Sequence, residues 1–285
     1  MPLIETADLM RDASAAGRGL GAFNVIHLET AEALADAAER AGRAIILQIS
    51  QNCAGFHRGL APIGLATLAI ARASTAPIAV HLDHAEDATL AREAIDLGFG
   101  SVMFDGARLD YAANVAATAR VVEYAHMHGK YVEAELGEIG GKDGAHAFGV
   151  RTDPEDAVRF VRDTGVDALA VAVGSSHAMI ERTASVDLAL VARLHQTLPV
   201  PLVLHGASGV SDDQLVAAVR SGMTKINIST HLNSVFTAQL REFLRANRHV
   251  VDSRRYLSAG RDAVAAEATR IIRLLSLPPN ESELP

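Results

Sequence analysis

The chain has 285 residues, of which 49% are hydrophobic and 21% are charged, as is typical of a globular protein large enough for an α/β barrel in one domain. Its formal net charge of -8, with dispersed basic residues, excludes an extensive nucleic-acid surface. Its one cysteine, Cys53, excludes an internal disulfide framework and indicates a reducing compartment. The first residues lack the layout of a signal peptide and no apolar run reaches the roughly 18 residues that span a bilayer, so the sequence predicts a soluble cytoplasmic protein with no membrane or nucleic-acid partner.

Apolar segments of strand length alternate with helix-like segments along most of the chain. A short polar-faced helix is expected over residues 5–17, and the predicted strands are 21–26, 44–50, 78–83, 101–105, 131–136, 169–173, 201–204 and 225–230. The clearest predicted helices are 29–41, 61–74, 87–97, 110–128 and 231–245, and Asp153-Pro154 and Ser211 are helix start signals. Eight apolar strands, each followed by a helix, indicate a closed TIM (β/α)8 barrel. A doubly wound open sheet is the alternative.

Two segments lie beyond this repeat. Residues 250–275 are expected to form a C-terminal helical extension that caps the barrel or serves a dimer. Residues 276–285 are rich in proline and polar residues and are expected to be a disordered tail. The sequence therefore predicts a single barrel domain over residues 1–275.

Polar side chains gather where the predicted strands end. In a TIM barrel that end carries the functional residues, because all strands are parallel and their loops meet at one face. The residues in question are Asn24, Ser50, Asp83, His84, Asp105, Glu135, His177, His205, Asn227 and Ser229. This placement predicts one functional site at the C-terminal face of the barrel.

Three of these residues are histidines that follow the third, sixth and seventh predicted strands, namely His84, His177 and His205. Three neutral imidazoles form an open zinc site, although each histidine alone is equally well explained as a core or rim residue. Asp83 is placed to exchange a proton with a substrate hydroxyl or, alternatively, to orient His84. His81 shares the side of the strand on which Asp83 lies, so we expect it in a second layer around the site.

Asp105 and Glu135 end neighbouring strands. They are candidates for a second or transient metal position, and rim hydrogen bonding is the equally good alternative.

Small and hydroxyl-bearing residues follow the last two strands, in Gly206-Ala207-Ser208-Gly209 and Asn227-Ile228-Ser229-Thr230. In TIM barrels these loops often bind phosphate through backbone N–H groups.

Taken together, these stretches resemble a class II, zinc-dependent ketose-bisphosphate aldolase of the fructose- and tagatose-bisphosphate type. The matching segments are 21–24, 81–84, 101–105, 133–137, 140–141, 169–177, 202–209 and 225–227. They occur in the order of the family and span nearly the whole predicted barrel.

The resemblance implies that His84, His177 and His205 bind a catalytic zinc and that Asp83 is the acid/base at the cleaved bond. It implies a second metal position at Asp105 and Glu135, and substrate contacts from Asn24 and Ser50. It further implies a phosphate site near a monovalent cation (Na⁺ or K⁺), formed by Gly206, Ala207, Ser208, Asn227, Ile228, Ser229 and Thr230. Zinc would stabilise the enediolate of dihydroxyacetone phosphate without a Schiff-base lysine.

The sequence departs from the family in the glycine-rich loop after the fifth strand. The family carries a glutamate after the paired glycines, whereas here the segment reads Lys142-Asp143-Gly144, so Asp143 and Glu138 are the candidates for the lid acid/base. The residue after the second of the three histidines, His177, is often glycine in the family and is Ala178 here, which would tighten the phosphate pocket.

The leading hypothesis is reversible cleavage of fructose 1,6-bisphosphate, as in glycolysis. Tagatose 1,6-bisphosphate or another phosphorylated ketose is the alternative substrate, because the two bisphosphates differ at one carbon that no motif reads. A catalytically weak phosphosugar-binding protein and a metal-free barrel isomerase are the hypotheses from other classes. The resemblance implies a homodimer or homotetramer.

Overall fold

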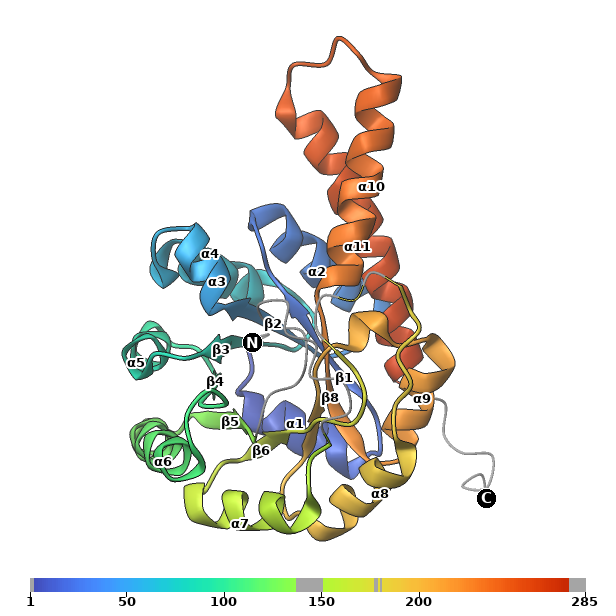
Figure 1. The fold of residues 1–285 in the computed structure, drawn as a ribbon. Helices are drawn as coiled ribbons and strands as arrows, with labels where there is room; N and C mark the ends of the chain where they lie inside the picture. The colour runs from blue at the N-terminus through green and yellow to red at the C-terminus, as the bar shows by residue number, and fades with distance from the viewer. Residues whose placement is uncertain (1–2, 137–150, 177–178, 180, 277–285) are drawn as a thin grey trace.

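The computed structural model describes residues 3–136, 151–176, 179 and 181–276, and its centre is a closed barrel of parallel strands (Figure 1). Each strand pairs with the next along the chain, and β8 pairs with β1. The strands are β1 Leu20–Asn24, β2 Ile45–Ser50, β3 Ile78–Ala85, β4 Ser101–Phe104, β5 Tyr131–Glu135, β6 Ala168–Ala170, β7 Leu202–Leu204 and β8 Met223–Ile228. The TIM-barrel prediction is confirmed.

Helices surround this barrel, and their starts follow the predicted signals. Asp153 accepts hydrogen bonds from the first backbone N–H groups of α7, and Ser211 accepts one from the first turn of α9. The helices are α1 Thr6–Ala15, α2 Leu28–Ala41, α3 Gln51–Phe56, α4 Leu60–Ala73, α5 Ala88–Leu97, α6 Tyr111–Met127, α7 Pro154–Thr164, α8 Leu188–Thr197, α9 Asp212–Arg220, α10 Thr230–Ala246 and α11 Ser253–Leu275. The short α3, capped by Ser50, was not predicted.

The core has two layers because side chains alternate along each strand. Outward side chains such as Phe23, Leu47 and Val80 pack beneath the helices. Inward apolar side chains fill the end of the barrel where the strands begin, and Met10 of α1 packs among them. Further along the strands the inward residues become polar. The barrel interior is therefore apolar at one end and polar towards the site.

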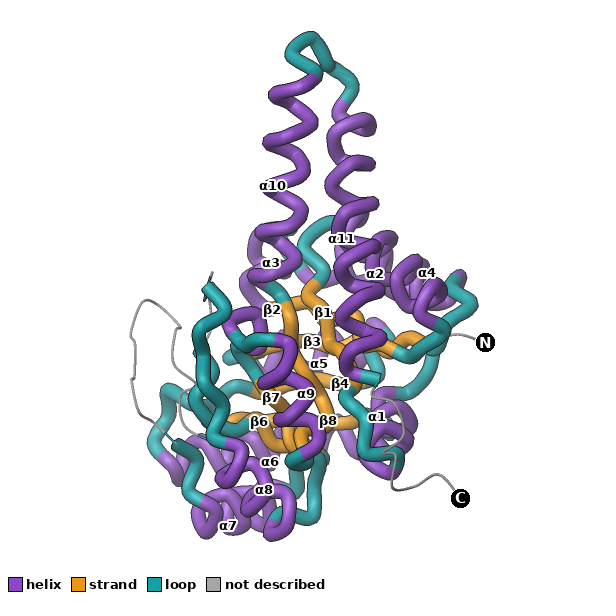
Figure 2. The backbone as a smooth tube through the Cα atoms, turned by 90° about the vertical axis from the view of Figure 1, so that its right-hand side faces the viewer, coloured by secondary structure: helices purple, strands orange, loops and turns teal. Residues whose placement is uncertain are grey.

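Helices α10 and α11 form an arm that extends away from the barrel (Figures 1 and 2). The arm is antiparallel, and α11 returns along α2 to end beside β1, where Gly19 donates to the carbonyl of Leu275 over 3.0 Å. The predicted extension over 250–275 is thus helical from residue 253, and all of the predicted tail except Ser276 lies outside the described residues. Among the described helices, none is long and apolar enough to cross a membrane.

Candidate metal centre

Side chains from several strands converge at the C-terminal end of the barrel. Asp83, Asp105, Glu135, His205 and Asn227 are all buried there, and His84 is partly buried. Donor atoms of Asp83, His84 and His205 lie within 4.8 Å of one another, as do those of His84, Asp105 and Glu135. Two overlapping groups of metal-binding residue types therefore share His84.

A β-bulge allows consecutive residues of β3 to reach this site. Between Leu82 and Ala85 the register to β4 shifts, so that Asp83 and His84 together oppose a single residue of the neighbouring strand. His84 takes φ 50, a left-handed conformation that non-glycine residues rarely adopt. In a regular strand the two side chains would point to opposite faces. The bulge instead brings both into the barrel mouth.

The hydrogen bonds of His84 and His205 fix which ring nitrogen carries the proton. His84 places Nδ1 2.7 Å from Oδ2 of Asp105, and His205 places Nε2 2.8 Å from Oε1 of Glu133. Each carboxylate only accepts, so both of these nitrogens are protonated and donate. The opposite nitrogens, Nε2 of His84 and Nδ1 of His205, are then unprotonated and lie 2.9 Å apart.

Two unprotonated nitrogens at this separation repel each other, whereas a divalent cation binds both. The donor set of imidazoles with an adjacent carboxylate, Asp83, is one that zinc accepts. The residues present therefore fit a catalytic divalent metal.

A chain of amides holds the carboxylate of Asp83. Asn24 donates to its Oδ2 over 3.0 Å, Asn227 donates to its Oδ1 over 3.4 Å, and Gln48 donates to the side-chain oxygen Oδ1 of Asn24 over 2.8 Å. Burial alone would raise the pKa of Asp83, but its electrostatic interactions with the neighbouring His84, His205 and Lys225, together with the Asn24 hydrogen bond, lower it below its ordinary value. Asp83 is therefore ionised and held in a fixed orientation.

The loops after β7 and β8 meet at the start of α10. The Ser208 hydroxyl accepts from the backbone N–H groups of Ser229 and His231, each over 3.2 Å. Gly206 has φ 69, and a Cβ there would lie 2.6 Å from the backbone of Ser176. The side chains of Ala207 and Ile228 are buried in the helix-facing core. Ser50 accepts from the backbone N–H of Cys53 at the start of α3.

Sequence reasoning missed three buried polar residues below the metal-binding groups, Gln48, Glu133 and Lys225. Each lies two residues before a predicted site residue on the same strand and so shares its inward face. That spacing, with charged residues inside otherwise apolar strands, was the available signal. Four other predicted site residues, His177, Ala178, Glu138 and Asp143, lie outside the described part of the chain.

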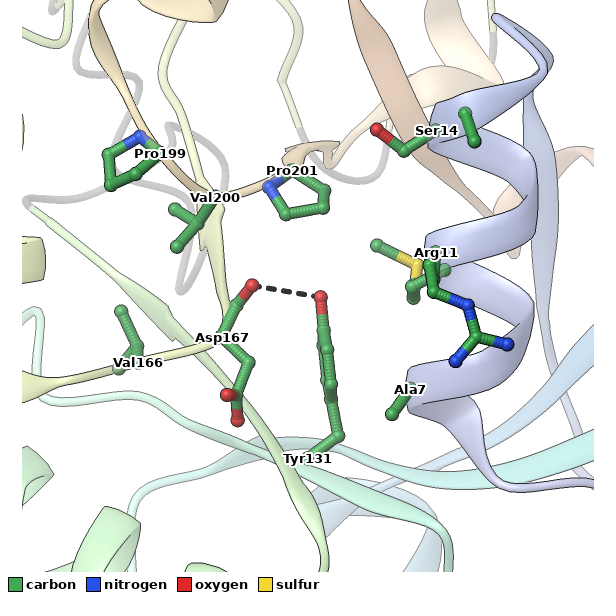
Figure 3. A pocket seen from close by; sticks show the side chains of 11 residues that line it. Ala7, Arg11, Ser14, Tyr131, Val166, Asp167, Pro199, Val200 and Pro201 are labelled. Atoms are coloured by element: carbon green, nitrogen blue, oxygen red, sulfur yellow. Dashed lines mark hydrogen bonds between the residues drawn. The ribbon is translucent and has the colours of Figure 1, made fainter.

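A cavity of about 490 Å³ lies at the opposite end of the barrel, between α1 and the segments that precede β6 and β7 (Figure 3). Arg11, Tyr131, Asp167 and Pro201 line it, and the Tyr131 hydroxyl donates to the backbone carbonyl of Asp167 over 2.9 Å. Its lining comes from α1 and from residues at or just before the beginnings of strands, whereas the polar site residues stand at the strand ends. This cavity is separate from the candidate metal centre.

Comparison with known proteins relates the whole barrel to aldolases. The sequence model for the family described as "Fructose-bisphosphate aldolase class-II" matches residues 4–277. The chain is 35% identical to a fructose-bisphosphate aldolase of Geobacillus stearothermophilus over 93% of this chain and 94% of that protein. It is 34% identical to the 6-phospho-5-dehydro-2-deoxy-D-gluconate aldolase of Bacillus subtilis (strain 168), over 93% and 92% of the two chains. The crystal structure of the YdjI aldolase from Escherichia coli K12 superposes with a TM-score of 0.84 at 30% identity, covering 96% of this chain and 97% of that chain.

Proposed function

The chain belongs to the class II fructose-bisphosphate aldolase family, a family of lyases that implies a divalent metal, and on that premise we propose that it cleaves fructose 1,6-bisphosphate reversibly. The products would be dihydroxyacetone phosphate and glyceraldehyde 3-phosphate. The observation that carries the proposal is the pair of unprotonated nitrogens on His84 and His205, 2.9 Å apart, with the Asp83 carboxylate beside them.

His84 and His205, together with His177, would hold the metal, which we propose is zinc. When bound, the metal supplies Lewis-acid polarisation of the substrate carbonyl. Asp105 would orient His84 through the hydrogen bond to Nδ1, and Asp105 and Glu135 would also serve a second metal position, because their oxygens lie close to His84.

Asp83 would take the proton from the hydroxyl next to the bond that breaks, and return it in the condensation direction. Its lowered pKa keeps it ionised at neutral pH, and the Asn24 and Asn227 amides fix its orientation. The remaining proton transfer, at the carbon of dihydroxyacetone phosphate, would fall to Asp143 or Glu138 of the glycine-rich loop.

The phosphate of dihydroxyacetone phosphate would bind at the start of α10. Backbone N–H groups already converge there on the Ser208 hydroxyl, and a helix N-terminus favours an anion. We propose that the phosphate is contacted by Gly206, Ser208, Asn227, Ser229 and Thr230 and by the backbones of Ala178, Ala207 and Ile228, with a monovalent cation (Na⁺ or K⁺) nearby. Asn24 and Ser50 would contact the substrate from the first two strands.

Tagatose 1,6-bisphosphate is the closest alternative substrate, and the Bacillus subtilis relative adds 6-phospho-5-dehydro-2-deoxy-D-gluconate. The last three carbons of that keto acid also form a dihydroxyacetone phosphate unit, so the same phosphate site and metal would serve it. A coupled assay that detects dihydroxyacetone phosphate, run on all three compounds, identifies the substrate. If kcat/KM is highest for fructose 1,6-bisphosphate, the proposal is supported. If kcat/KM is higher for either of the other two compounds, that compound is the substrate and the proposal is wrong.

Two other classes of function are less well supported. A phosphosugar-binding protein has no need of an ionised, doubly held carboxylate beside the metal ligands. A metal-free barrel isomerase has no need of two imidazole nitrogens placed to bind a divalent cation beside the Asp83 carboxylate.

We further propose that the enzyme is a cytoplasmic homodimer or homotetramer that acts in glycolysis or related carbohydrate metabolism. The α10–α11 arm supports self-association because it leaves Leu244 42% exposed and Val251 91% exposed away from the barrel. The free thiol of Cys53 suits a reducing compartment. Sedimentation equilibrium measures the number of subunits directly.

A further inference from the structure

Glu133 is buried at the centre of the barrel between a histidine and a lysine. Its exposed fraction is 1%, as is that of Lys225, and His205 is fully buried. Oε1 of Glu133 lies 2.8 Å from Nε2 of His205, and Oε2 lies 2.7 Å from the ammonium of Lys225. The two oxygens of one carboxylate therefore contact different donors.

The contact to Glu133 decides the tautomer of His205. The amide nitrogen of Asn227 also lies 3.1 Å from Nε2 of His205, and it would donate to that nitrogen if the ring proton were on Nδ1. The carboxylate contact is shorter and charge-assisted, so it outweighs the amide contact and keeps the proton on Nε2. Nδ1 then keeps its lone pair towards His84.

Lys225 fixes the orientation of Glu133. An ammonium only donates, so Oε2 must face it, and the carboxylate cannot turn away from His205 without losing a buried hydrogen bond. A buried ion pair of this kind is costly to desolvate and is a poor choice for stability alone. Its position directly beneath a proposed metal ligand offers a reason for its presence.

We propose that Glu133 and Lys225 are positioning residues that hold the proton of His205 on Nε2 and so present Nδ1 to the metal. Neither residue touches substrate or metal in this account. The inference rests on the proposed function, because it takes His84 and His205 as metal ligands.

Glu133→Gln tests the inference because the amide has one oxygen and one NH2 group. Lys225 requires the oxygen, so the NH2 group must face Nε2 of His205, where the Asn227 amide is a second donor. Nε2 then becomes an acceptor and the ring proton moves to Nδ1. The zinc dissociation constant, measured by competition with a chelating indicator, should rise by about 10–100-fold.

The double variant Glu133→Gln/Lys225→Met separates proton placement from general damage. Without the ammonium, the amide is free to turn its oxygen towards Nε2 of His205 and restore the original tautomer. We therefore expect the double variant to bind zinc more tightly than Glu133→Gln alone. If the double variant binds more weakly than the single variant, or if the single variant binds as the wild type does, the inference is wrong.

Thr6→Val is the matched control, because it also removes a buried hydrogen bond inside the barrel. Thr6 is 1% exposed and bonds to Ser101 over 2.7 Å, and His81 bonds to the same Ser101 hydroxyl over 2.7 Å. Zinc affinity of Thr6→Val should match the wild type. A loss equal to that of Glu133→Gln would show that any defect in the barrel interior weakens the site and would overturn the inference.

Nitrogen-15 NMR of the imidazoles in the metal-free wild-type protein needs no variant to fold. It should show the proton of His205 on Nε2, and a proton on Nδ1 overturns the inference. A wild-type protein that binds no zinc at all, yet shows the proton on Nε2, would instead contradict the proposed metal site and leave the positioning of His205 by Glu133 intact.

Discussion

Asn24 donates its side-chain amide to Oδ2 of Asp83 over 3.0 Å, across the gap between the first and third strands of the barrel. Gln48, on the strand between them, donates to the side-chain oxygen Oδ1 of Asn24 over 2.8 Å. The carboxylate proposed to move a proton is thus held by a line of neutral amides. An ionised acceptor in a fixed direction is what a general base needs.

Asp83→Asn should lower kcat by about 10²–10⁴-fold, the usual effect of losing a general acid or base. The amide is nearly isosteric and keeps its place beside Asn24, so the protein should still fold and bind zinc. Turnover by coupled assay and zinc content by elemental analysis check both parts. An inactive variant without zinc would instead identify Asp83 as a metal ligand, and full activity would remove it from the mechanism.

Gln48→Leu should lower kcat by roughly 10-fold, about 1.4 kcal/mol, because Asn24 loses the donor that orients it. Gln48 is fully buried and its Oε1 has no partner among the described residues, so leucine removes an unsatisfied polar atom. Tm should therefore stay level or rise while activity falls. A fall in both would mean that Gln48 is simply part of the core.

Gly206→Ala should destabilise the protein by about 2–5 kcal/mol, from the left-handed backbone together with a collision. Its Cβ would lie 2.6 Å from the backbone of Ser176, beside the segment that leads to His177. Gly42→Ala is the control because it has a similar φ of 61 and open space around the new Cβ. Chemical denaturation should show a cost of only about 1–2 kcal/mol there. Equal costs at the two positions would contradict the collision.

Arg270→Met should destabilise the protein at pH 7 and destabilise it less as the pH falls. Burial opposes ionisation of Asp212 and Glu267, but hydrogen bonds from Arg270, together with Arg182 at Asp212 and His231 at Glu267, outweigh it and lower both pKa values. A lowered pKa gives stability that is present above the ordinary values, 3.8 for Asp212 and 4.5 for Glu267, and lost as pH falls through the folded values.

The Tm difference between wild type and Arg270→Met should therefore be a few degrees at pH 7 and shrink on acidification. The effect is modest because the pair is partly exposed, with side-chain exposures of 42% for Arg270 and 35% for Asp212. Added salt should reduce it further. A difference that does not change with pH would assign Arg270 a packing role.

The repeat of strands and helices was readable from the sequence because the barrel's strands are apolar runs of the right length. The helix expected over 231–245 is observed as Thr230–Ala246, and the extension expected from residue 250 is helical from Ser253. The helix α3 was missed because its six residues are too few to show a helical period.

How the site residues converge could be predicted less well from the sequence, and β3 shows the reason. Strand alternation puts His81 and Asp83 on one face and sends His84 to the other. The bulge that brings His84 inward depends on pairing with β4 and leaves no mark in the sequence. Glu133 and Lys225 were missed for a related reason. Glu133 and Lys225 are 92 positions apart in the sequence, so each looks like an isolated charge, and only the fold shows that they form a pair.

The most direct test of the account is cleavage of fructose 1,6-bisphosphate by the full chain before chelation, after removal of metal with a strong chelator, and after addition of zinc. Turnover should be lost on chelation and restored by zinc, and His84→Ala and His205→Ala should be inactive throughout. Undiminished turnover in protein shown to be free of metal would contradict the account.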